Sequence, residues 1–454
     1  MKKVLSILLA ILIAMSFAAC SVPEDDPTGT NGITEPTVIY DQKEFKHEAT
    51  IAETVLLDKD GIRITATDLV YGSYAAELHL TFENNTGKDL IFVSNSIGYS
   101  CNSVNGYMVA DGYINCDVAA GKKANESASF SYRSLMIYGI YEIADIEIGF
   151  SISDDDYNYT YTGPCRIATS GATNYDYQAL HYREVIAGKT NQQQYDYSVP
   201  YFGTDVIYEN KGISIVSQTL IKNVDDEYSL LMEVINNTDQ MVRAITSDIS
   251  LNGLLVCDST WSNDSINPGK TAIVDINVSA ALEPSFWEAL GIEEVGTIGL
   301  TMEFKDFDGR NIASATKLKV EVSNQSNEFS SSGIQIHNNK GLRLISMGLH
   351  EDPSSYSGDL HLLILAENTS GKTLELHDVY GSLSINDYMA NYSFYTTTIE
   401  NGQWVLVDIR LYESGLQDAG VTSVDQIKTL EFSISVKNES YKEIDKATIE
   451  IKFP

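Results

Sequence analysis

Apolar and polar residues alternate in short runs along most of the chain. Residues 78–82 read Leu-His-Leu-Thr-Phe, and residues 127–132 alternate in the same way. Successive side chains of a strand point to opposite faces, so this period of two predicts strands with one buried and one wet face. Residues 90–93 are apolar throughout and predict a buried strand. Clusters rich in Gly, Asn and Asp separate these runs, which indicates an all-β chain.

Two phrases occur three times each, always in the same order. The first is a turn that ends in glycine and opens an alternating strand, at residues 59–64, 210–215 and 339–344. The second is a turn rich in asparagine, at residues 82–88, 234–239 and 366–372. From the glycine to the first asparagine the interval is 23, 24 and 27 residues (84−61, 236−212 and 368−341). Self-similarity in a fixed order predicts three copies of one module.

Later landmarks recur in the same order in each copy. The hairpin signal Asn105-Gly106-Tyr107 matches Asn252-Gly253-Leu254 and Asn386-Asp387-Tyr388, and Gly121-Lys122 matches Gly269-Lys270 and Gly402-Gln403. Apolar residues three apart follow Gly139, Gly291 and Gly420, and this step predicts one helical turn before a final strand pair. Six or more short strands with frequent turns are typical of a β-sandwich.

The landmarks divide the chain into three tandem β-sandwiches with connecting segments. The sandwiches are repeat 1 (residues 51–169), repeat 2 (204–323) and repeat 3 (332–454). Residues 20–50 are polar and predict a spacer, and residues 324–331 predict a short flexible linker. Residues 170–203 form a longer joint, with one amphipathic helix expected near residues 175–186 and irregular chain at 191–200.

Residues 1–19 have the pattern of a signal peptide. Lys2-Lys3 is basic, and residues 4–17 form an almost wholly apolar run that is too short to be a mature membrane span. The stretch resembles a bacterial lipoprotein signal, although Phe17 stands where that family usually has leucine. The resemblance implies that Cys20 becomes the lipid-modified first residue, and two acyl chains suffice for stable anchoring. The alternative is an ordinary secretory signal with a cysteine by chance.

The charge balance limits the partners. The chain has 63 acidic and 30 basic side chains and a net charge of −33. Nucleic acid is excluded as a partner because a phosphate backbone needs a basic surface. For the same reason we expect contact with a membrane only through the lipid anchor. The 27 tyrosines outnumber the 14 phenylalanines, which suits strands that bury a ring and hydrate its hydroxyl.

The remaining cysteines and histidines show no metal-binding spacing. Cys101 and Cys116 flank a predicted hairpin and allow a disulfide in an exported protein, while buried thiols are the alternative. Cys165 and Cys257 have no partner that the sequence indicates. His79 and His361 fall on the wet face of their predicted strands.

Two acidic hairpin tips are the best candidates for a metal ion. Residues 154–156 (Asp154 to Asp156) and 306–308 (Asp306 to Asp308) occupy the same place in repeats 1 and 2. Clustered carboxylates suit calcium, but Asp and Gly at a hairpin tip are also ordinary turn residues. We therefore keep both interpretations open and predict no resident metal or cofactor.

Sequence patterns of known catalytic sites are missing. The chain has no Gly-x-Ser-x-Gly elbow, no Walker loop and no Gly-x-Gly-x-x-Gly phrase. With so many acids, any pair of carboxylates proposed for glycoside hydrolysis would be arbitrary. We predict no catalytic residue.

The order of landmarks resembles a known type of repeat domain. A glycine-opened strand, a Glu-Asn-Asn-Thr-Gly-Lys turn at residues 83–88, an Asn-Gly-Tyr hairpin and a Pro-Gly-Lys turn at residues 268–270 are similar to repeats of uncharacterised lipoproteins from clostridial-type Gram-positive bacteria. The resemblance implies immunoglobulin-like β-sandwiches of the group that includes secreted immunoprotective antigens. It carries no catalytic residue.

The sequence thus predicts a non-catalytic lipoprotein on the outer face of the cytoplasmic membrane, with three tandem domains that bind an unknown protein or glycan or act as a spacer. Residues 157–161 and 175–208 are the stretches richest in tyrosine, a residue enriched on recognition surfaces, although half-buried strand tyrosines would give the same pattern. An extracellular hydrolase or processing enzyme with unfamiliar residues is one alternative. A solute receptor for a transporter is a weaker one, because the alternating βα pattern of such receptors is missing.

Overall fold

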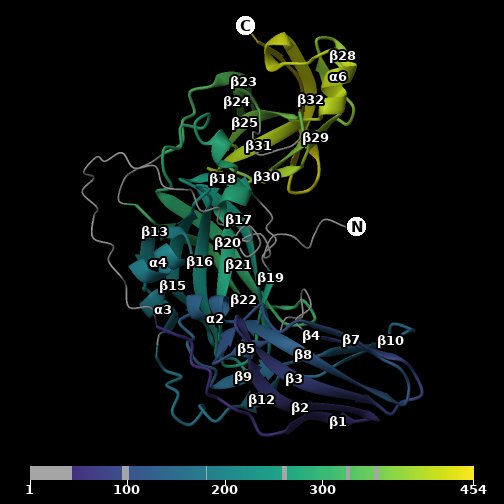
Figure 1. Cartoon of the computed structure of the whole chain (residues 1–454). Coiled ribbons are helices and arrows are strands. Elements are labelled where there is room, and N and C mark those ends of the chain that lie inside the picture. The colour runs from purple at the N-terminus through teal and green to yellow at the C-terminus, as the bar shows by residue number, and fades with distance from the viewer. Residues whose placement is uncertain are drawn as a thin grey trace, which may run out of the picture. The chain divides into compact units, whose positions relative to one another are not determined.

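A computed structural model describes residues 43–453 except 95–101, 180, 258–262, 324–327 and 352–356. From residue 42 onward the chain forms one compact unit. Among the described residues β-strands predominate, and they pair into five sheets, which confirms an all-β chain (Figure 1). The predictions for residues 1–42, including Cys20, lie outside the described residues, as does Cys101. No helix in the described ranges is long and apolar enough to cross a membrane.

Repeat 1 builds two facing sets of strands from its alternating runs. The elements are β1 (Thr54–Lys59), β2 (Ile62–Tyr71), β3 (Ala75–Asn84), β4 (Leu90–Ser94), β5 (Ser103–Val104), β6 (Tyr107–Met108), β7 (Ile114–Val118), β8 (Lys122–Ser131), α2 (Tyr132–Ile137), β9 (Asp145–Ile148), β10 (Ser151–Asp154), β11 (Tyr159–Tyr161) and β12 (Cys165–Ala168). One sheet has the order β1-β2-β3-β8 and another β11-β10-β4-β7. The rings of Phe82 and Phe92 meet between them, with centroids 4.9 Å apart.

The joint is followed by repeat 2, whose strands come in the same order along the chain as those of repeat 1. The elements are α3 (His181–Val185), α4 (Lys189–Gln194), β13 (Tyr197–Gly203), β14 (Tyr208–Asn210), β15 (Ile213–Asn223), β16 (Tyr228–Asn236), β17 (Val242–Leu251), β18 (Leu254–Cys257), β19 (Asn263–Ile266), β20 (Lys270–Asn277), α5 (Val278–Ala281), η1 (Pro284–Phe286), β21 (Thr297–Lys305) and β22 (Asn311–Glu321). In the joint, the prediction of one helix and then irregular chain was wrong. Two short helices form, and β13 pairs with β15, because an unpaired sheet edge offers its backbone groups to the incoming chain.

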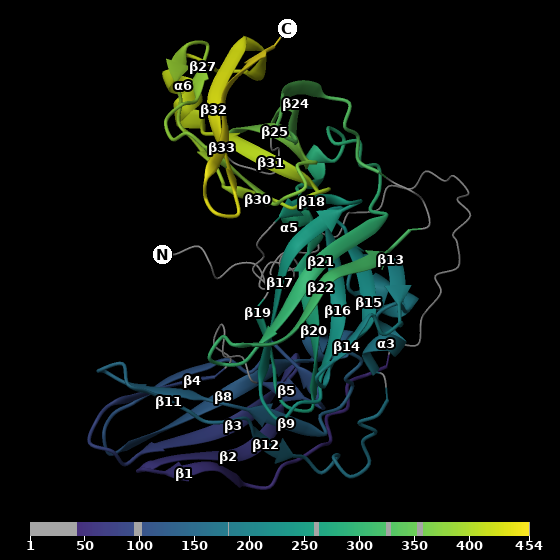
Figure 2. The same ribbon diagram turned by 180° about the vertical axis from the view of Figure 1, so that it is seen from behind.

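Repeat 3 completes the series. Its elements are β23 (Ile334–Asn339), β24 (Leu342–Glu351), β25 (Leu360–Asn368), β26 (Leu374–Asp378), β27 (Ser384–Ile385), β28 (Tyr388–Met389), β29 (Tyr392–Phe394), β30 (Thr397–Ile399), β31 (Trp404–Leu411), α6 (Glu413–Asp418), η2 (Val424–Gln426), β32 (Thr429–Asn438) and β33 (Glu443–Lys452). Strands β32 and β33 form a long antiparallel pair, seen in Figure 2. Three buried apolar clusters, each drawn mainly from one repeat, lie between the sheets.

The recurring glycines Gly139, Gly291 and Gly420 end helical segments and do not begin them. All three have φ between 66° and 77°. The amide of the next residue donates back to a carbonyl five residues earlier, as Ile140 does to Leu135, which is the hydrogen bond that closes a Schellman motif. The predicted helical turn after the glycine forms in repeat 3, as η2, but the prediction was wrong for repeats 1 and 2. The glycine's positive φ serves the helix before it.

The recurring asparagine turn is held by one wholly buried side chain in each repeat. Asn236 donates its amide to the carbonyls of Gln240 and Ile266, over 2.9 and 2.8 Å, and its side-chain oxygen accepts from the Thr238 backbone amide. Asn84 and Asn368 make the same set of bonds at the same place. The asparagine therefore ties the strand, the turn and the facing sheet together.

The hairpin signals with Asn105, Asn252 and Asn386 form three equivalent arms. We call them arm 1 (residues 103–108), arm 2 (250–257) and arm 3 (384–389). The asparagines have φ between 49° and 52°, and the next residues are also left-handed, as tight hairpin turns require. The Asn105 amide donates to the Glu142 carbonyl over 2.7 Å, and its side-chain oxygen accepts from the Ala144 backbone. Equivalent bonds from Asn252 and Asn386 fix the other arms.

Arm 1 extends a sheet of repeat 2. Strand β6 lies parallel to β20, and the Thr271 backbone amide donates to the Gly106 carbonyl over 2.9 Å. Met108 is buried in the apolar cluster of repeat 2. The Lys270 ammonium lies 2.6 Å from the Glu147 carboxylate of β9, and both side chains are almost buried. Backbone pairing, an apolar insertion and an ion pair thus join the two repeats.

Arm 2 joins repeat 3 in the same register. Strand β18 lies parallel to β31, with Leu254 opposite Trp404 and Leu255 opposite Val405. Leu255 is buried in the apolar cluster of repeat 3, as Met108 is in that of repeat 2. One mode of strand addition is therefore used twice along the chain.

We expect Asn236→Ala to lower the free energy of unfolding by roughly 2–4 kcal/mol, because two buried carbonyls and one amide lose their partner. Urea unfolding followed by circular dichroism measures the loss. The neighbouring exposed Asn237, which uses only its backbone amide here, gives the control Asn237→Ala with a change of less than about 0.5 kcal/mol. Equal losses in the two variants would contradict the assigned role.

Candidate functional site

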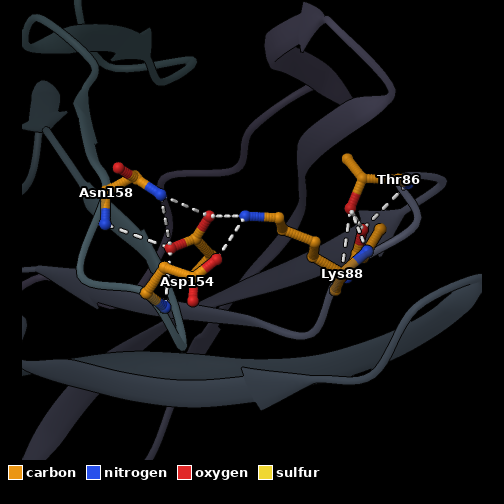
Figure 3. A network of polar contacts seen from close by, with 6 residues as sticks. Thr86, Lys88, Asp154 and Asn158 are labelled. Atoms are coloured by element: carbon orange, nitrogen blue, oxygen red, sulfur yellow. Dashed lines mark hydrogen bonds and ion pairs between the residues drawn. The ribbon is translucent and has the colours of Figure 1, made fainter.

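The acidic tip of repeat 1 is closed by a lysine from another strand connection. The Lys88 ammonium lies 2.6 Å from the Asp154 carboxylate and 2.8 Å from that of Asp156 (Figure 3). The Asp154 side chain also accepts from the backbone amides of Asp156 and Asn158, each over 3.0 Å. The hydrogen bond from Lys88, followed by those from Asn158, holds the pKa of Asp154 well below its usual range. These contacts are those of an ordinary braced turn.

The acidic tip of repeat 2 is also braced by a basic side chain, here one from its own hairpin. Arg310 lies 3.0 Å from the Asp308 carboxylate and 3.7 Å from that of Asp306, and Asp306 accepts from the Arg310 backbone amide over 2.8 Å. Across the residues that the structure describes, no three or more His, Cys, Asp and Glu side chains gather to hold a metal ion. Of the two interpretations that the sequence left open, the contacts at both tips favour turn chemistry.

A row of exposed aromatic rings lies beside the acidic tip of repeat 1. Tyr159 and Tyr161 of the edge strand β11 are 54% and 45% exposed. Their rings stack with centroids 6.2 Å apart, because side chains two apart in a strand share one face. Phe307, 45% exposed at the tip of the β21–β22 hairpin, meets Tyr161 edge to face at 5.5 Å. We call Tyr159, Tyr161 and Phe307 the aromatic row.

The aromatic row combines residues that the sequence located and one that it missed. The tyrosine-rich stretch was singled out, but Phe307 was considered only as part of an acidic tip. The sequence does hold a sign of Phe307: a large apolar side chain stands between two aspartates at a hairpin tip, where it cannot reach its own core. Tyr157 is also exposed next to the row, and its backbone is left-handed with φ 61°. By contrast, Tyr182 and Tyr195 of the second tyrosine-rich stretch are buried.

The cysteines and histidines occupy separate places. Cys116 is buried in β7, and burial raises the pKa of its thiol to about 11. Cys165 and Cys257 lie in β12 and β18, far apart in sequence and in different repeats. The prediction that His361 faces water was wrong. It is buried under the ring of Phe286, 5.1 Å away, because repeat 2 covers this face of β25. His79 in repeat 1 is half-exposed, which agrees with its predicted position on the wet face.

The junction of repeats 1 and 2 gathers ionisable groups with raised pKa values. Burial, followed by the neighbouring charge of Asp275, raises the pKa of Asp264 to about 7, and burial raises that of Asp275 to about 6. Asp111 of repeat 1 has a pKa raised to about 6, again by burial. Burial and then the charges of these three carboxylates raise the pKa of Tyr138. The ring of Tyr138 stacks on that of Tyr107 of arm 1, with centroids 6.3 Å apart. We call Asp111, Asp264 and Asp275 the junction acids.

A buried ion pair and a shallow pocket complete this junction. Arg183 of α3 lies 2.5 Å from the Glu233 carboxylate, which also accepts from the Ser217 hydroxyl over 2.9 Å. The pocket, of about 410 Å³, is lined by Arg183, Glu184, Phe202 and Thr204. Arg183 is already engaged by Glu233, so the pocket presents little unused polar chemistry.

Comparisons with known proteins identify no family. No protein-family model matches the chain, and no curated protein matches it. Among solved structures, a protein of unknown function from Porphyromonas gingivalis W83 is 14% identical, covers 50% of this chain and 92% of its own, and has a TM-score of 0.15. A bacterial ice-binding adhesin implicated in host cell surface retention is 9% identical over 83% of this chain and 90% of its own, with a TM-score of 0.13. The exo-chitosanase CsxA of Amycolatopsis orientalis is 11% identical over 52% of this chain and 26% of its own, with a TM-score of 0.15. At such TM-scores neither a shared fold nor a function follows.

We expect the junction acids to make stability fall as pH rises from about 4 to about 7. Their folded pKa values lie above the unfolded value, so the folded state binds more protons in this range and loses that advantage on titration. Asp264→Asn should therefore raise the free energy of unfolding by on the order of 2 kcal/mol at pH 7.5 and leave it nearly unchanged at pH 4. Urea titrations at both pH values test this. An equal effect at both would contradict the assignment.

Proposed function

We propose that the chain is a non-catalytic binding protein of the outer cell surface, built from three tandem immunoglobulin-like β-sandwich domains and held by a lipid on Cys20. The separate buried clusters of the repeats and their shared strand order support the domain count. The signal-like start of the sequence supports the anchor, and the similarity to clostridial-type lipoproteins supports both.

The aromatic row carries the binding part of the proposal. Three exposed rings in contact at a strand edge and a hairpin tip form a contiguous apolar surface, and such a surface is typical of an interaction site, whereas single exposed apolar residues are common. The face of an aromatic ring carries partial negative charge, so it attracts the weakly positive C–H groups of a sugar. Lys88 and Asp156 lie next to the strand that bears the tyrosines and supply polar groups. We therefore propose a glycan as the ligand.

The row is suited to an extended ligand. Its rings follow one another at centroid distances of 6.2 and 5.5 Å, so a chain of sugar units can contact more than one ring. Tyr159 and Tyr161 belong to repeat 1 and Phe307 to repeat 2. The surface therefore depends on the joining of the two repeats.

We expect Tyr159→Ala and Tyr161→Ala each to weaken glycan binding by about tenfold, because each removes a stacking surface of roughly 1–2 kcal/mol. A glycan array identifies the ligand, and calorimetry on the best glycan measures affinity. Tyr74→Ala removes a tyrosine that is exposed elsewhere in repeat 1 and should leave affinity unchanged. If no glycan binds at millimolar concentration, the binding proposal fails and a spacer remains.

The anchor has its own test. Cys20→Ala in the producing cell should abolish metabolic labelling with a radioactive fatty acid and release the protein into the medium, since no acyl chains hold it to the membrane. Cys165→Ala, in a strand of repeat 1, is the matched control and should change neither result. Retention of label in Cys20→Ala would show that the lipid is attached elsewhere, and a wild-type protein without label would show that no lipid is attached.

A further inference from the structure

Arm 3 has the form of the two joining arms, but within the described part of the chain it adds to no acceptor strand. Strand β28 pairs only with β27 among the described strands. Tyr388 and Met389 are 60% and 59% exposed. The equivalent Tyr107 and Met108 of arm 1 are 7% and 8% exposed. Met108 of arm 1 is buried in the apolar cluster of the following repeat, and its counterpart Met389 on arm 3 is exposed to solvent.

Among the described strands, the edge complementary to arm 3 is left unpaired in repeat 1. Strand β8 ends the sheet of repeat 1 and is the counterpart of β20 and β31, which receive arms 1 and 2. The turn Gly121-Lys122 that opens β8 matches Gly269-Lys270, which opens β20. Lys122 and Lys123 are exposed, whereas Lys270 is almost buried against repeat 1. In position, β8 is therefore an acceptor edge to which no described strand adds as an arm.

Charge complementarity links the two open ends. At the junction of repeats 1 and 2, Glu147 lies opposite Ser103 of arm 1 and pairs with Lys270 over 2.6 Å. Glu431 lies opposite Ser384 of arm 3 in the same register. Glu431 is exposed, and no described residue forms a salt bridge with it or with Lys122. The two halves of the ion pair are thus present, the base in repeat 1 and the acid in repeat 3.

The internal junction without this pair shows that the charges change together. Where arm 2 meets repeat 3, Gly299 takes the place of Glu147, since it lies opposite Ser250 of arm 2. Gln403 takes the place of Lys270 there. The acid and the base are both present at the first junction and both missing at the second, and both are present at the open ends.

We propose that the chain binds a second copy of itself head to tail. Arm 3 of one copy adds to the β8 edge of the next at Lys122 and Lys123, Tyr388 lies opposite Lys123, and Glu431 pairs with Lys122. Because this contact joins two different surfaces, it leaves an open end on each side and builds a linear assembly. It is a property of the fold and holds whether or not the aromatic row binds a glycan.

The contact between copies is weaker than the internal junctions. Leu231 and Ile273 of repeat 2 pack on the core of repeat 1. The strand register places His79 and Asn125 at the corresponding positions of repeat 1. The apolar part of the contact is therefore smaller, and the net charge of −33 opposes association. We therefore expect the assembly to be reversible. It is favoured where many copies lie on one surface, because their effective concentration is high there.

Charge exchange in the intact mature chain tests the proposal. Sedimentation velocity over a wide concentration range should show wild-type protein moving reversibly to larger species. Lys122→Glu alone and Glu431→Lys alone should each weaken the association constant by about tenfold, because like charges then face each other at the contact. An equimolar mixture of the two variants should restore association, since each variant supplies the opposite charge that the other needs.

Charge changes at exposed sites outside the proposed contact serve as controls. Lys59→Glu and Glu53→Lys change the net charge by the same amounts at exposed sites in repeat 1 away from β8 and should associate as the wild type does. Circular dichroism and thermal unfolding confirm that each variant is folded. Wild-type protein that stays monomeric throughout, or a mixture no better than its single variants, would overturn the proposal, and arm 3 would then not be a site for a second copy.

Discussion

A sheet edge presents backbone N–H and C=O groups that must be paired, covered or exposed to water. In this chain an arm of one repeat pairs with the sheet edge of the next repeat. The Thr271 amide on the edge of β20 donates to the Gly106 carbonyl of arm 1. Met108 and the Lys270–Glu147 pair secure the same contact from either side. The edge of β31 is covered by arm 2 in the same register. The arrangement of the repeats depends on these few backbone bonds.

The candidate binding surface is a consequence of that joining. Tyr161 and Phe307 come from different repeats and meet because arm 1 holds the repeats together. The junction acids lie at the same boundary, where burial raises their pKa values. Loosening of the junction would therefore separate the aromatic rings and rehydrate the acids at once. The boundary between repeats 1 and 2 thus holds both the exposed aromatic rings and the carboxyls with raised pKa values.

Local patterns could be predicted from the sequence, and contacts between distant segments could not. The alternation of residues 78–82, the Asp60-Gly61 hairpin and the all-β class follow from turn residues and a period of two, and the structure confirms them. The asparagine turns were recognised as turns, but the bond from Asn84 to Val118, 34 residues later, depends on the packing of two sheets. His361 followed its alternation correctly and is still buried, because Phe286 from the preceding repeat covers it.

The candidate sites show the same division. Sequence drew attention to Asp154 and to the tyrosines of β11, yet Lys88, which neutralises Asp154, lies 66 residues away. Phe307 joins the aromatic row from another repeat. The arms were visible as hairpins that repeat an asparagine followed by glycine or aspartate, but so short a hairpin says nothing about its partner. Its role appears only when the register of β6 on β20 is known.

Amide hydrogen exchange tests the central claim most directly. The Thr271 amide is bonded across the junction, whereas no described strand adds to the edge of β8 that carries the corresponding amide of Lys123. In dilute protein the account predicts that Thr271 exchanges about as slowly as amides inside β16, and that Lys123 exchanges orders of magnitude faster. Fast exchange at Thr271, equal to that at Lys123, would show that arm 1 does not hold the repeats together.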